Sequence, residues 1–483
     1  MKENAIPYHK QRMKRPVFIR RYMPYYIENL KLALPLMVAQ LGQILVQLAD
    51  NIMVGRWGGE NALPLAAVSF GGQVAALFFL FSLGITMGLT PVVGELVGRK
   101  RTEGVGAWLM NGVMLYVGLG IIMMLLQLAL QPLLFCMGQP VEVVEAALPY
   151  YRIMAYSIPP IMLFASFKQF LEGLGNTWIS MVVLLGANLM NVLFNYLFIF
   201  GRGGCPELGI TGAAVSTFLA RCIAPISVIL VFLLNKKYRT HLIGWRIGMA
   251  SRRMLRRLIY MGLPIAGQII LEASAFVFTS IMMGWFDTVA ISANQISNTM
   301  GNCSFSIVLA LGAATTIRVS HAYGARDYQK MERSAWAALH VVFAWNTLTA
   351  ILFFSLRNVI PTAFTANPEV IELAAILLIC TAFFQFFDGL QNVAIGILRG
   401  LQDVKIIPLF SFLAYFVLNI PIAYLLAFPL GMGPAGLVLA CSVGLFTAAL
   451  LGIRRIKRDI HRLKAAQAQQ EAELAEGNKA ARM

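Results

Sequence analysis

The sequence predicts an all-α polytopic membrane protein with about 12 transmembrane helices in two six-helix repeats that form a two-lobed body. The composition is the first observation behind this prediction. Hydrophobic residues make up 58% of the 483 residues, charged residues make up 13%, and the mean hydropathy is +0.71. A soluble domain has about 25% charged residues. The apolar stretches are continuous and do not alternate, which argues against a β-barrel.

Long apolar runs are the second observation, because a helix needs about 20 such residues to cross a bilayer. The approximate cores of the expected spans are 31–54, 69–97, 107–130, 145–170, 177–200, 210–234, 257–285, 289–320, 334–356, 370–398, 406–428 and 434–453.

Lys and Arg gather on one side of these spans, which accounts for the net charge of +17 without a nucleic-acid partner. This side holds the N-terminal arm, Arg99–Arg101, residues 235–257 and 324–333, the turn from Arg399 to Lys405, and the C-terminal tail. Positive loops are cytoplasmic, so both termini are expected in the cytoplasm and the number of spans is expected to be even.

An internal duplication is the third observation. Leu34-Pro35 matches Leu263-Pro264, and LEGLGN at 171–176 matches LRGLQD at 398–403, with separations of roughly 228 positions. Six spans in each repeat is an even number, so the repeats run the same way through the membrane. Such repeats are related by an axis along the membrane normal, and their site lies between the lobes near the midplane.

The expected domains follow from these spans and loops. They are an N-terminal cytoplasmic arm (1–27), an N-terminal lobe (28–234), a basic connector (235–256), a C-terminal lobe (257–456) and a polar cytoplasmic tail (457–483).

Three acids within apolar segments are the main candidate functional residues: Asp50, Glu272 and Asp388. A carboxylate at mid-bilayer depth costs about 2.5–3.5 kcal/mol even on the lenient insertion scale. We expect these acids to couple transport to an ion or a proton. The alternatives are an interfacial Asp50 paired with Arg56, a Glu272 reaching toward the headgroups, and an Asp388 with a structural hydrogen bond.

Polar and aromatic neighbours support this interpretation. Asn188, Asn191 and Asn195 are spaced three and four apart and so share one helical face. With Thr217, Asn191 and Asn195 are predicted to support Asp50. Arg221 is the one more interior cation, and the sequence names no partner for it.

Around Asp388, Gln385 is a predicted supporting residue. Phe384, Phe387 and Gln391 are substrate-cavity candidates, since aromatic faces attract organic cations.

Motifs for other chemistry are absent from the sequence. It has no G-x-x-x-x-G-K-[ST] loop, no H-E-x-x-H and no G-x-S-x-G, and its six cysteines have no C-x-x-C spacing. We therefore expect no enzyme activity and no cofactor. Active transport would be driven by a gradient of Na⁺ or H⁺.

The combined motifs resemble the multidrug and toxic compound extrusion (MATE) transporters, in particular the NorM-type branch. LALPLMVAQ…DNIMVG in one half, MGLPIAGQ…LEASAF…IMMG in the other, AATTIRVSHAYGA and FQFFDGLQNVAIGILRGLQD carry this resemblance, which covers about residues 28–456. It implies antiport, in which sodium or protons enter while cationic, lipophilic compounds leave.

The resemblance also implies roles for individual residues. Asp50 matches the first-helix acid of the N-terminal lobe, and Glu272 and Asp388 match paired acids that are linked to sodium, a possible Na⁺ site. Some members have an Asp in the place of Asn195, and a NorM-type member has a Tyr in the place of Phe384. We therefore expect proton relay at Asn195 and a hydroxyl contact at Phe384 to be altered.

The resulting hypothesis is a cation-coupled multidrug exporter with V-shaped lobes, functional as a monomer in a bacterial inner membrane. Its expected partners are small organic cations, drugs, Na⁺ or H⁺ and the lipid bilayer. A lipid or lipid-linked oligosaccharide flippase of a related fold is the alternative, although its cavity would be lined with Arg and Lys. An integral-membrane enzyme is the third hypothesis.

Overall fold

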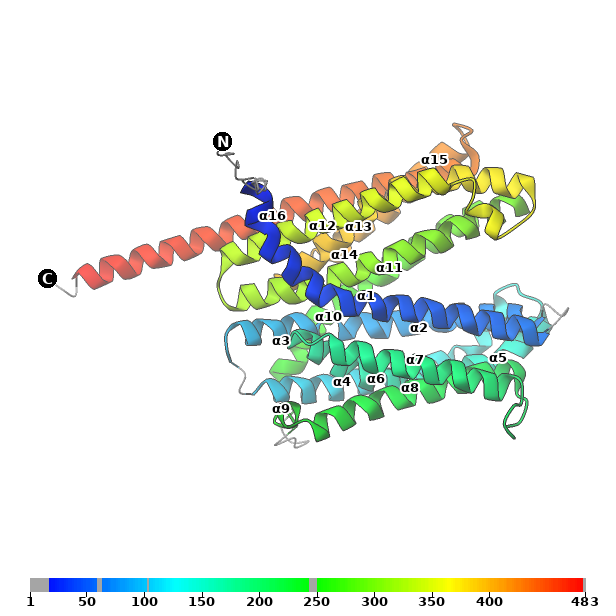
Figure 1. The fold of residues 1–483 in the computed structure, drawn as a ribbon, viewed down its shortest axis with the longest axis horizontal. Helices are drawn as coiled ribbons and strands as arrows, with labels where there is room; N and C mark the ends of the chain where they lie inside the picture. Colours follow the sequence, from blue (N-terminus) through cyan, green and yellow to red (C-terminus); the bar gives the residue numbers. More distant parts are fainter. Residues whose placement is uncertain (1–16, 59–62, 102–103, 243–249, 481–483) are drawn as a thin grey trace, which may run out of the picture.

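The structure is a computed structural model that describes residues 17–58, 63–101, 104–242 and 250–480. Every regular element within these ranges is helical (Figure 1). The first half contains α1 (Val17–Gly58), α2 (Leu63–Thr86), α3 (Leu89–Gly98), α4 (Val105–Ala129), the 3₁₀ helix η1 (Gln131–Cys136), α5 (Val141–Tyr156), α6 (Ile158–Gly173), α7 (Trp178–Ile199), α8 (Gly209–Leu234) and α9 (Lys236–Arg239).

The second half repeats much of this plan. It contains α10 (Arg252–Met283), α11 (Thr288–Gly324), α12 (Tyr328–Leu356), the 3₁₀ helix η3 (Pro361–Ala363), α13 (Pro368–Gly400), α14 (Ile407–Ser411), the π-helix η4 (Phe412–Asn419), α15 (Ile420–Ala427) and α16 (Gly433–Ala480).

Eleven stretches of the described chain are long and apolar enough to span a membrane, which makes this a multi-pass membrane protein. The expected span at 145–170 is not one continuous helix. It consists of α5 and α6, which are separated at Ser157. Pro159 and Pro160 follow at once, and a proline has no amide hydrogen with which to continue a helix. The two shorter helices together occupy the range of the twelfth expected span.

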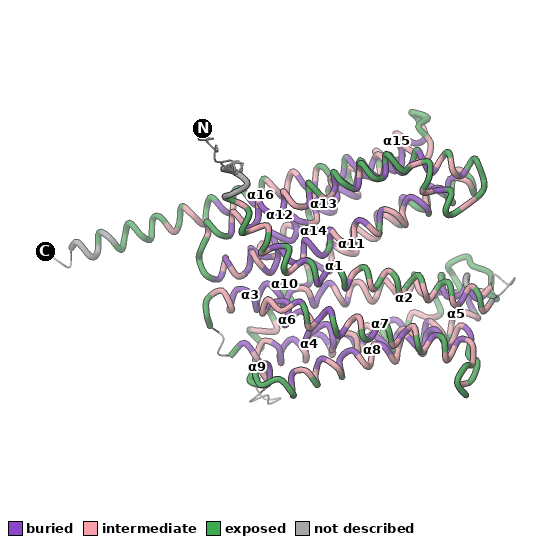
Figure 2. Tube along the Cα trace, viewed as in Figure 1, coloured by how far each residue is buried: buried purple, intermediate pink, exposed green. Residues whose placement is uncertain are grey.

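The ends of the expected domains are partly helical. α1 begins at Val17 and α10 at Arg252, so each lobe's first helix starts earlier than its apolar core. Residues 1–16 of the expected arm and residues 243–249 of the expected connector lie outside the described ranges. The expected polar tail is the end of α16, which extends away from the body with mostly exposed residues (Figure 2).

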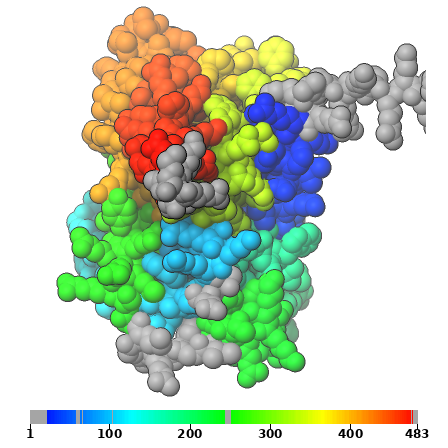
Figure 3. All heavy atoms as spheres, turned by 90° about the vertical axis from the view of Figure 1, so that its left-hand side faces the viewer, coloured from blue at the N-terminus to red at the C-terminus, as the bar shows by residue number. Residues whose placement is uncertain are grey.

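The helices form two lobes, each with its own apolar core. Leu109, Phe167 and Phe232 belong to a buried cluster of the first lobe, and Leu377 and Leu437 belong to one of the second. The lobes lie together at the end where α16 leaves the body, and their helices diverge toward the opposite end (Figure 1). Figure 3 views the joined end, where segments of the two lobes abut.

The first helix of each half packs against the other half. α1 contacts α11 and α12, and α10 contacts α2. α10 crosses the first lobe where α2 gives way to α3, and a Cβ atom built on Gly88 would lie 2.7 Å from the backbone nitrogen of Gly262. Only glycine allows this approach, so the break between α2 and α3 positions both lobes.

Candidate ion and substrate sites

The structure brings together the four residues predicted for the site of the first lobe. Half-buried Asp50 of α1 accepts a hydrogen bond from Asn195 Nδ2 of α7. Asn195 Nδ2 also lies 3.3 Å from Asn191 Oδ1, and Asn191 Nδ2 donates to Thr217 Oγ1 of α8 over 3.3 Å. When the oxygen and nitrogen of the Asn191 side-chain amide are exchanged, the nitrogen donates to Asp50 Oδ1 over 3.0 Å. One acid is thus surrounded by neutral polar groups.

Arg221 lies beyond this group on α8. Its Nη1 donates to Ser157 Oγ over 2.6 Å, at the interruption between α5 and α6, and its guanidinium lies 4.6 Å from the centre of the Phe79 ring. Arg221 is also within electrostatic reach of Asp50. The described residues show no ion pair between Asp50 and Arg56.

In the second lobe, Glu272 belongs to a chain of polar side chains. Gln268 Nε2, one turn earlier on α10, donates to Glu272 Oε2 over 2.5 Å. Arg399 Nη2 of α13 donates to Gln268 Oε1 over 2.7 Å. Gln268 therefore links the acid to the cation, although Glu272 lies on one helix and Arg399 on another.

Asp388 is buried on α13 and lies within electrostatic reach of Glu272. Tyr415 of η4 interacts with both carboxyls, and its hydroxyl donates to Gln391 Oε1 over 3.1 Å. π-Helical turns occur often at functional sites, because they re-aim a side chain within a helix. The two acids of this lobe thus share a tyrosine.

The other predicted residues of α13 have partners within the lobe. Gln385 Nε2 donates to the carbonyl oxygen of Gly301 over 2.6 Å, and so joins α13 to α11. Phe384 is buried in the apolar core, and half-buried Phe387 packs edge-on against Phe446 with a centroid distance of 5.3 Å. Their proposed contact with substrate stays a prediction.

The structure does not bring all three acids to one place, since Asp50 lies in the first lobe and the other two in the second. The described residues contain no group of three or more His, Cys, Asp or Glu side chains that could hold a metal ion.

Sequence reasoning missed Gln268, Arg399 and Tyr415. It counted Arg399 among the charges of a cytoplasmic turn, whereas this residue lies in the last turn of α13 and its side chain donates to Gln268. The match between LEGLGN and LRGLQD was the available signal. It pairs half-buried Arg399 with Glu172, which is buried.

A family comparison agrees with the duplication. The model of the MatE family matches residues 35–197 and again residues 264–425. The chain belongs to the MatE family. The two matches of the MatE model begin 229 residues apart (264 − 35), close to the spacing of the internal repeat.

Curated relatives within this family are similar over most of their length. The probable multidrug resistance protein NorM of Mannheimia succiniciproducens is 31% identical, with 90% of this chain and 94% of the relative covered. The probable NorM of Mesorhizobium japonicum is 29% identical (89% and 93% covered), and the NorM of Photobacterium profundum is 28% identical (89% and 94%). The resemblance to the NorM-type branch is confirmed.

Solved structures share the MatE fold. An outward-facing multidrug resistance MATE family transporter matches with a TM-score of 0.82 at 21% identity, covering 91% of this chain and 97% of its own. A eukaryotic MATE transporter matches with a TM-score of 0.81 at 19% identity, covering 92% and 99%. The two-lobed helical fold is confirmed. Membership of this family of transporters also confirms that the protein is not an enzyme.

Proposed function

We propose that this MatE protein exports cationic, lipophilic drugs by antiport with sodium ions or protons. The observation that carries the proposal is the pair of interior carboxyls in the second lobe, Glu272 and Asp388, within reach of each other. Two carboxylates that share a site repel each other unless a cation or a proton neutralises one of them. The pair is therefore suited to bind a coupling ion and release it again.

Competition for this negative charge would couple the export of drug to the entry of the coupling ion. A lipophilic cation and a coupling ion both neutralise the pair, so binding of one lowers the affinity for the other. Each occupant shifts the protein toward the conformation in which it binds better, which is the requirement for alternating access. We assign Asp50, with Asn191, Asn195 and Thr217, to a supporting polar site in the first lobe.

The names of the NorM relatives support drugs as substrates. We also propose a bacterial inner membrane with both termini in the cytoplasm, because Lys and Arg are concentrated on that side. Since one chain holds both lobes, a monomer is proposed to be sufficient for transport.

The proposal is tested by efflux of ethidium from proteoliposomes, driven in separate experiments by a sodium gradient and by a pH gradient. We expect Asp388→Asn to abolish efflux driven by the coupling ion, because a neutral amide can neither bind a cation strongly nor exchange a proton. Glu372→Gln is the matched control, since Glu372 is exposed on the same helix. It should leave efflux unchanged.

Three results would contradict parts of this proposal. Coupled efflux that survives Asp388→Asn would move the coupling ion away from the second lobe. An equal loss of efflux in Glu372→Gln would show that the buried position of Asp388 is not the reason for its effect. No efflux under either gradient would favour the flippase alternative, which binding of a polyprenyl phosphate would then support.

A further inference from the structure

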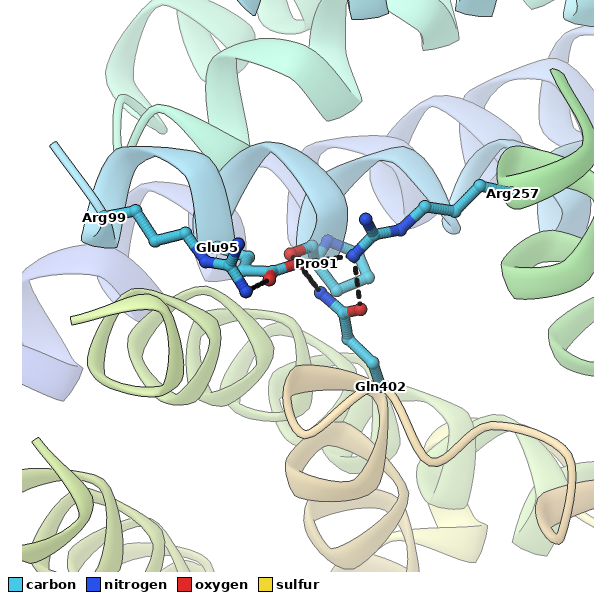
Figure 4. A network of polar contacts seen from close by, with 5 residues as sticks. All are labelled: Pro91, Glu95, Arg99, Arg257 and Gln402. Carbon is cyan, nitrogen blue, oxygen red and sulfur yellow. Dashed lines mark hydrogen bonds and ion pairs between the residues drawn. The ribbon is translucent and has the colours of Figure 1, made fainter. Parts of the chain in front are cut away.

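A buried acid outside the proposed ion sites joins the two lobes. Glu95 of α3 belongs to the first lobe, and its side chain is buried. Its Oε2 is 2.5 Å from Arg257 Nη2 of α10 and accepts a hydrogen bond of 2.7 Å from Gln402 Nε2, which follows α13 (Figure 4). Arg257 Nη2 also donates to Gln402 Oε1 over 2.9 Å, which closes a triangle of polar contacts across the lobe boundary.

The backbone of Gln402 is strained where it makes these contacts. Its φ of 64° is left-handed, a conformation that is unfavourable for any residue other than glycine. The matching residue of the first half, in LEGLGN, is Gly175 with a φ of 83°, which has no such cost. The second half therefore keeps a glutamine where glycine would be easier, and its amide bridges Glu95 and Arg257.

A second contact has the corresponding place in the duplicated structure. His321 of α11 occupies the position that Glu95 has in α3, since Thr90 and Thr316 align with the same offset of 226 (316 − 90 and 321 − 95). His321 Nε2 lies 2.8 Å from the carbonyl oxygen of Gly173, which ends α6 of the first lobe. Each lobe thus extends one polar side chain to the turn after a helix of the other.

Tight backbone packing surrounds both contacts. A Cβ atom on Gly98 would collide with the carbonyl oxygen of His321, and one on Gly324 would collide with that of Glu95. Two glycines at matching positions therefore let α3 and α11 cross in contact. These contacts lie near the ends of α3 and α11, and α3 lies at the joined end of the lobes (Figure 1).

Arg99 makes this contact reversible. It follows the last residue of α3 directly and forms an ion pair with Glu95, one turn earlier. If the lobes separate, Gln402 moves away with the second lobe, but Arg99 stays with Glu95. The acid therefore keeps a counter-charge in both states, so no buried charge is left unpaired, which would be strongly destabilising.

We propose that Glu95, Arg257 and Gln402 form a latch that keeps the lobes closed at this end, and that the latch opens in each transport cycle. The second clause rests on the proposed function, whereas the closure itself is a property of the resting protein. The partners are charged or directional hydrogen-bonding groups, so they stabilise one relative placement of the lobes.

The test is a distance measurement between the lobes by electron spin resonance, without any substrate. Spin labels at Lys236→Cys and Gln329→Cys, both exposed, report on the two lobes in a chain whose six native cysteines are replaced by serine, in lipid nanodiscs. Gln402→Gly is the decisive variant, because glycine relieves the strained backbone while the latch is lost. We expect an unchanged or higher Tm and a rise of about tenfold in the ratio of open to closed molecules.

Two further variants complete the design. Glu95→Gln removes the charge and should open the same end. Asp403→Asn is the matched control, because Asp403 adjoins Gln402 but pairs with Arg455 of its own lobe over 2.6 Å. It should leave the distance distribution of the parent chain unchanged.

The latch is wrong if Gln402→Gly and Glu95→Gln keep the parent distribution, or if Asp403→Asn opens the lobes equally. Because no transported compound is present, failure of the drug-efflux proposal would not change this outcome. If the variants still export drug and their distance distribution is unaltered, the proposed function stands and the latch is rejected.

Discussion

In each lobe one acid, Asp50 or Glu272, accepts a hydrogen bond from a side-chain amide. Asp50 accepts from the amide of Asn195, whereas Glu272 is linked through Gln268 to the guanidinium of Arg399. An amide stabilises a carboxylate without neutralising it, while a nearby cation does both. The hydrogen bond from the Asn195 amide to Asp50 can be tested with one substitution.

Asn195→Ala should lower the stability of the first lobe by about 1.5–3 kcal/mol, because Asp50 loses a hydrogen bond to its charged group. The loss is measured as a fall in Tm of the purified protein. Asn188→Ala is the control on the same helix face. Asn188 Nδ2 is buried without a hydrogen-bond partner in the described structure, so its removal should cost less. Equal falls in Tm would show that the Asp50 contact contributes nothing specific.

Glycines decide how closely the helices of the two lobes can cross. Gly88 and Gly262 meet at the crossing of α10 with the first lobe, and Gly98 and Gly324 meet where α3 crosses α11. Other helical glycines, such as Gly186 of α7, have open space around the position of a Cβ atom. The same residue type therefore has an interface role at some positions and none at others.

Gly88→Ala should destabilise the protein by about 1–3 kcal/mol, because the added methyl group overlaps the backbone of α10 and overpacking has this cost. Gly186→Ala should be neutral or raise stability by up to about 1 kcal/mol, since alanine is the better helix former. Thermal unfolding of the two variants beside the parent protein measures both effects. A Gly88→Ala protein as stable as Gly186→Ala would mean that the helices can move apart without cost.

At the scale of the whole molecule, the halves are interlocked and not merely joined. Ala33 and Leu36 of α1 are buried in a core cluster of the second half. Leu258 and Ala266 of α10 are buried in the main cluster of the first half. Neither half can bury its apolar surface fully by itself, so the connector between them should be dispensable for assembly.

A chain divided within residues 243–249 and expressed as two fragments should therefore assemble. We expect the fragments to co-purify through a tag on one of them and to give a single complex in size-exclusion chromatography. Either fragment expressed alone should aggregate or be degraded, which is the control. Fragments that each purify as stable, separate proteins would contradict the interlocked arrangement.

The sequence by itself determined the helical membrane class, the spans, the repeat and the three interior acids. Hydropathy and spacing are local properties, so they can be read without knowing which helices touch. Helical spacing places Asn191 and Asn195 on one face, and in the structure Asn195 contacts both Asp50 and Asn191.

Only the tertiary structure decided which distant groups meet. The link from Arg399 through Gln268 to Glu272, the break of the expected span at Ser157, and the contact of Glu95 with Arg257 and Gln402 all depend on how helices cross. Crossing is set by packing between residues far apart in the chain. A side chain at the end of a helix can face a loop or a neighbouring lobe, and the local pattern is the same in both cases.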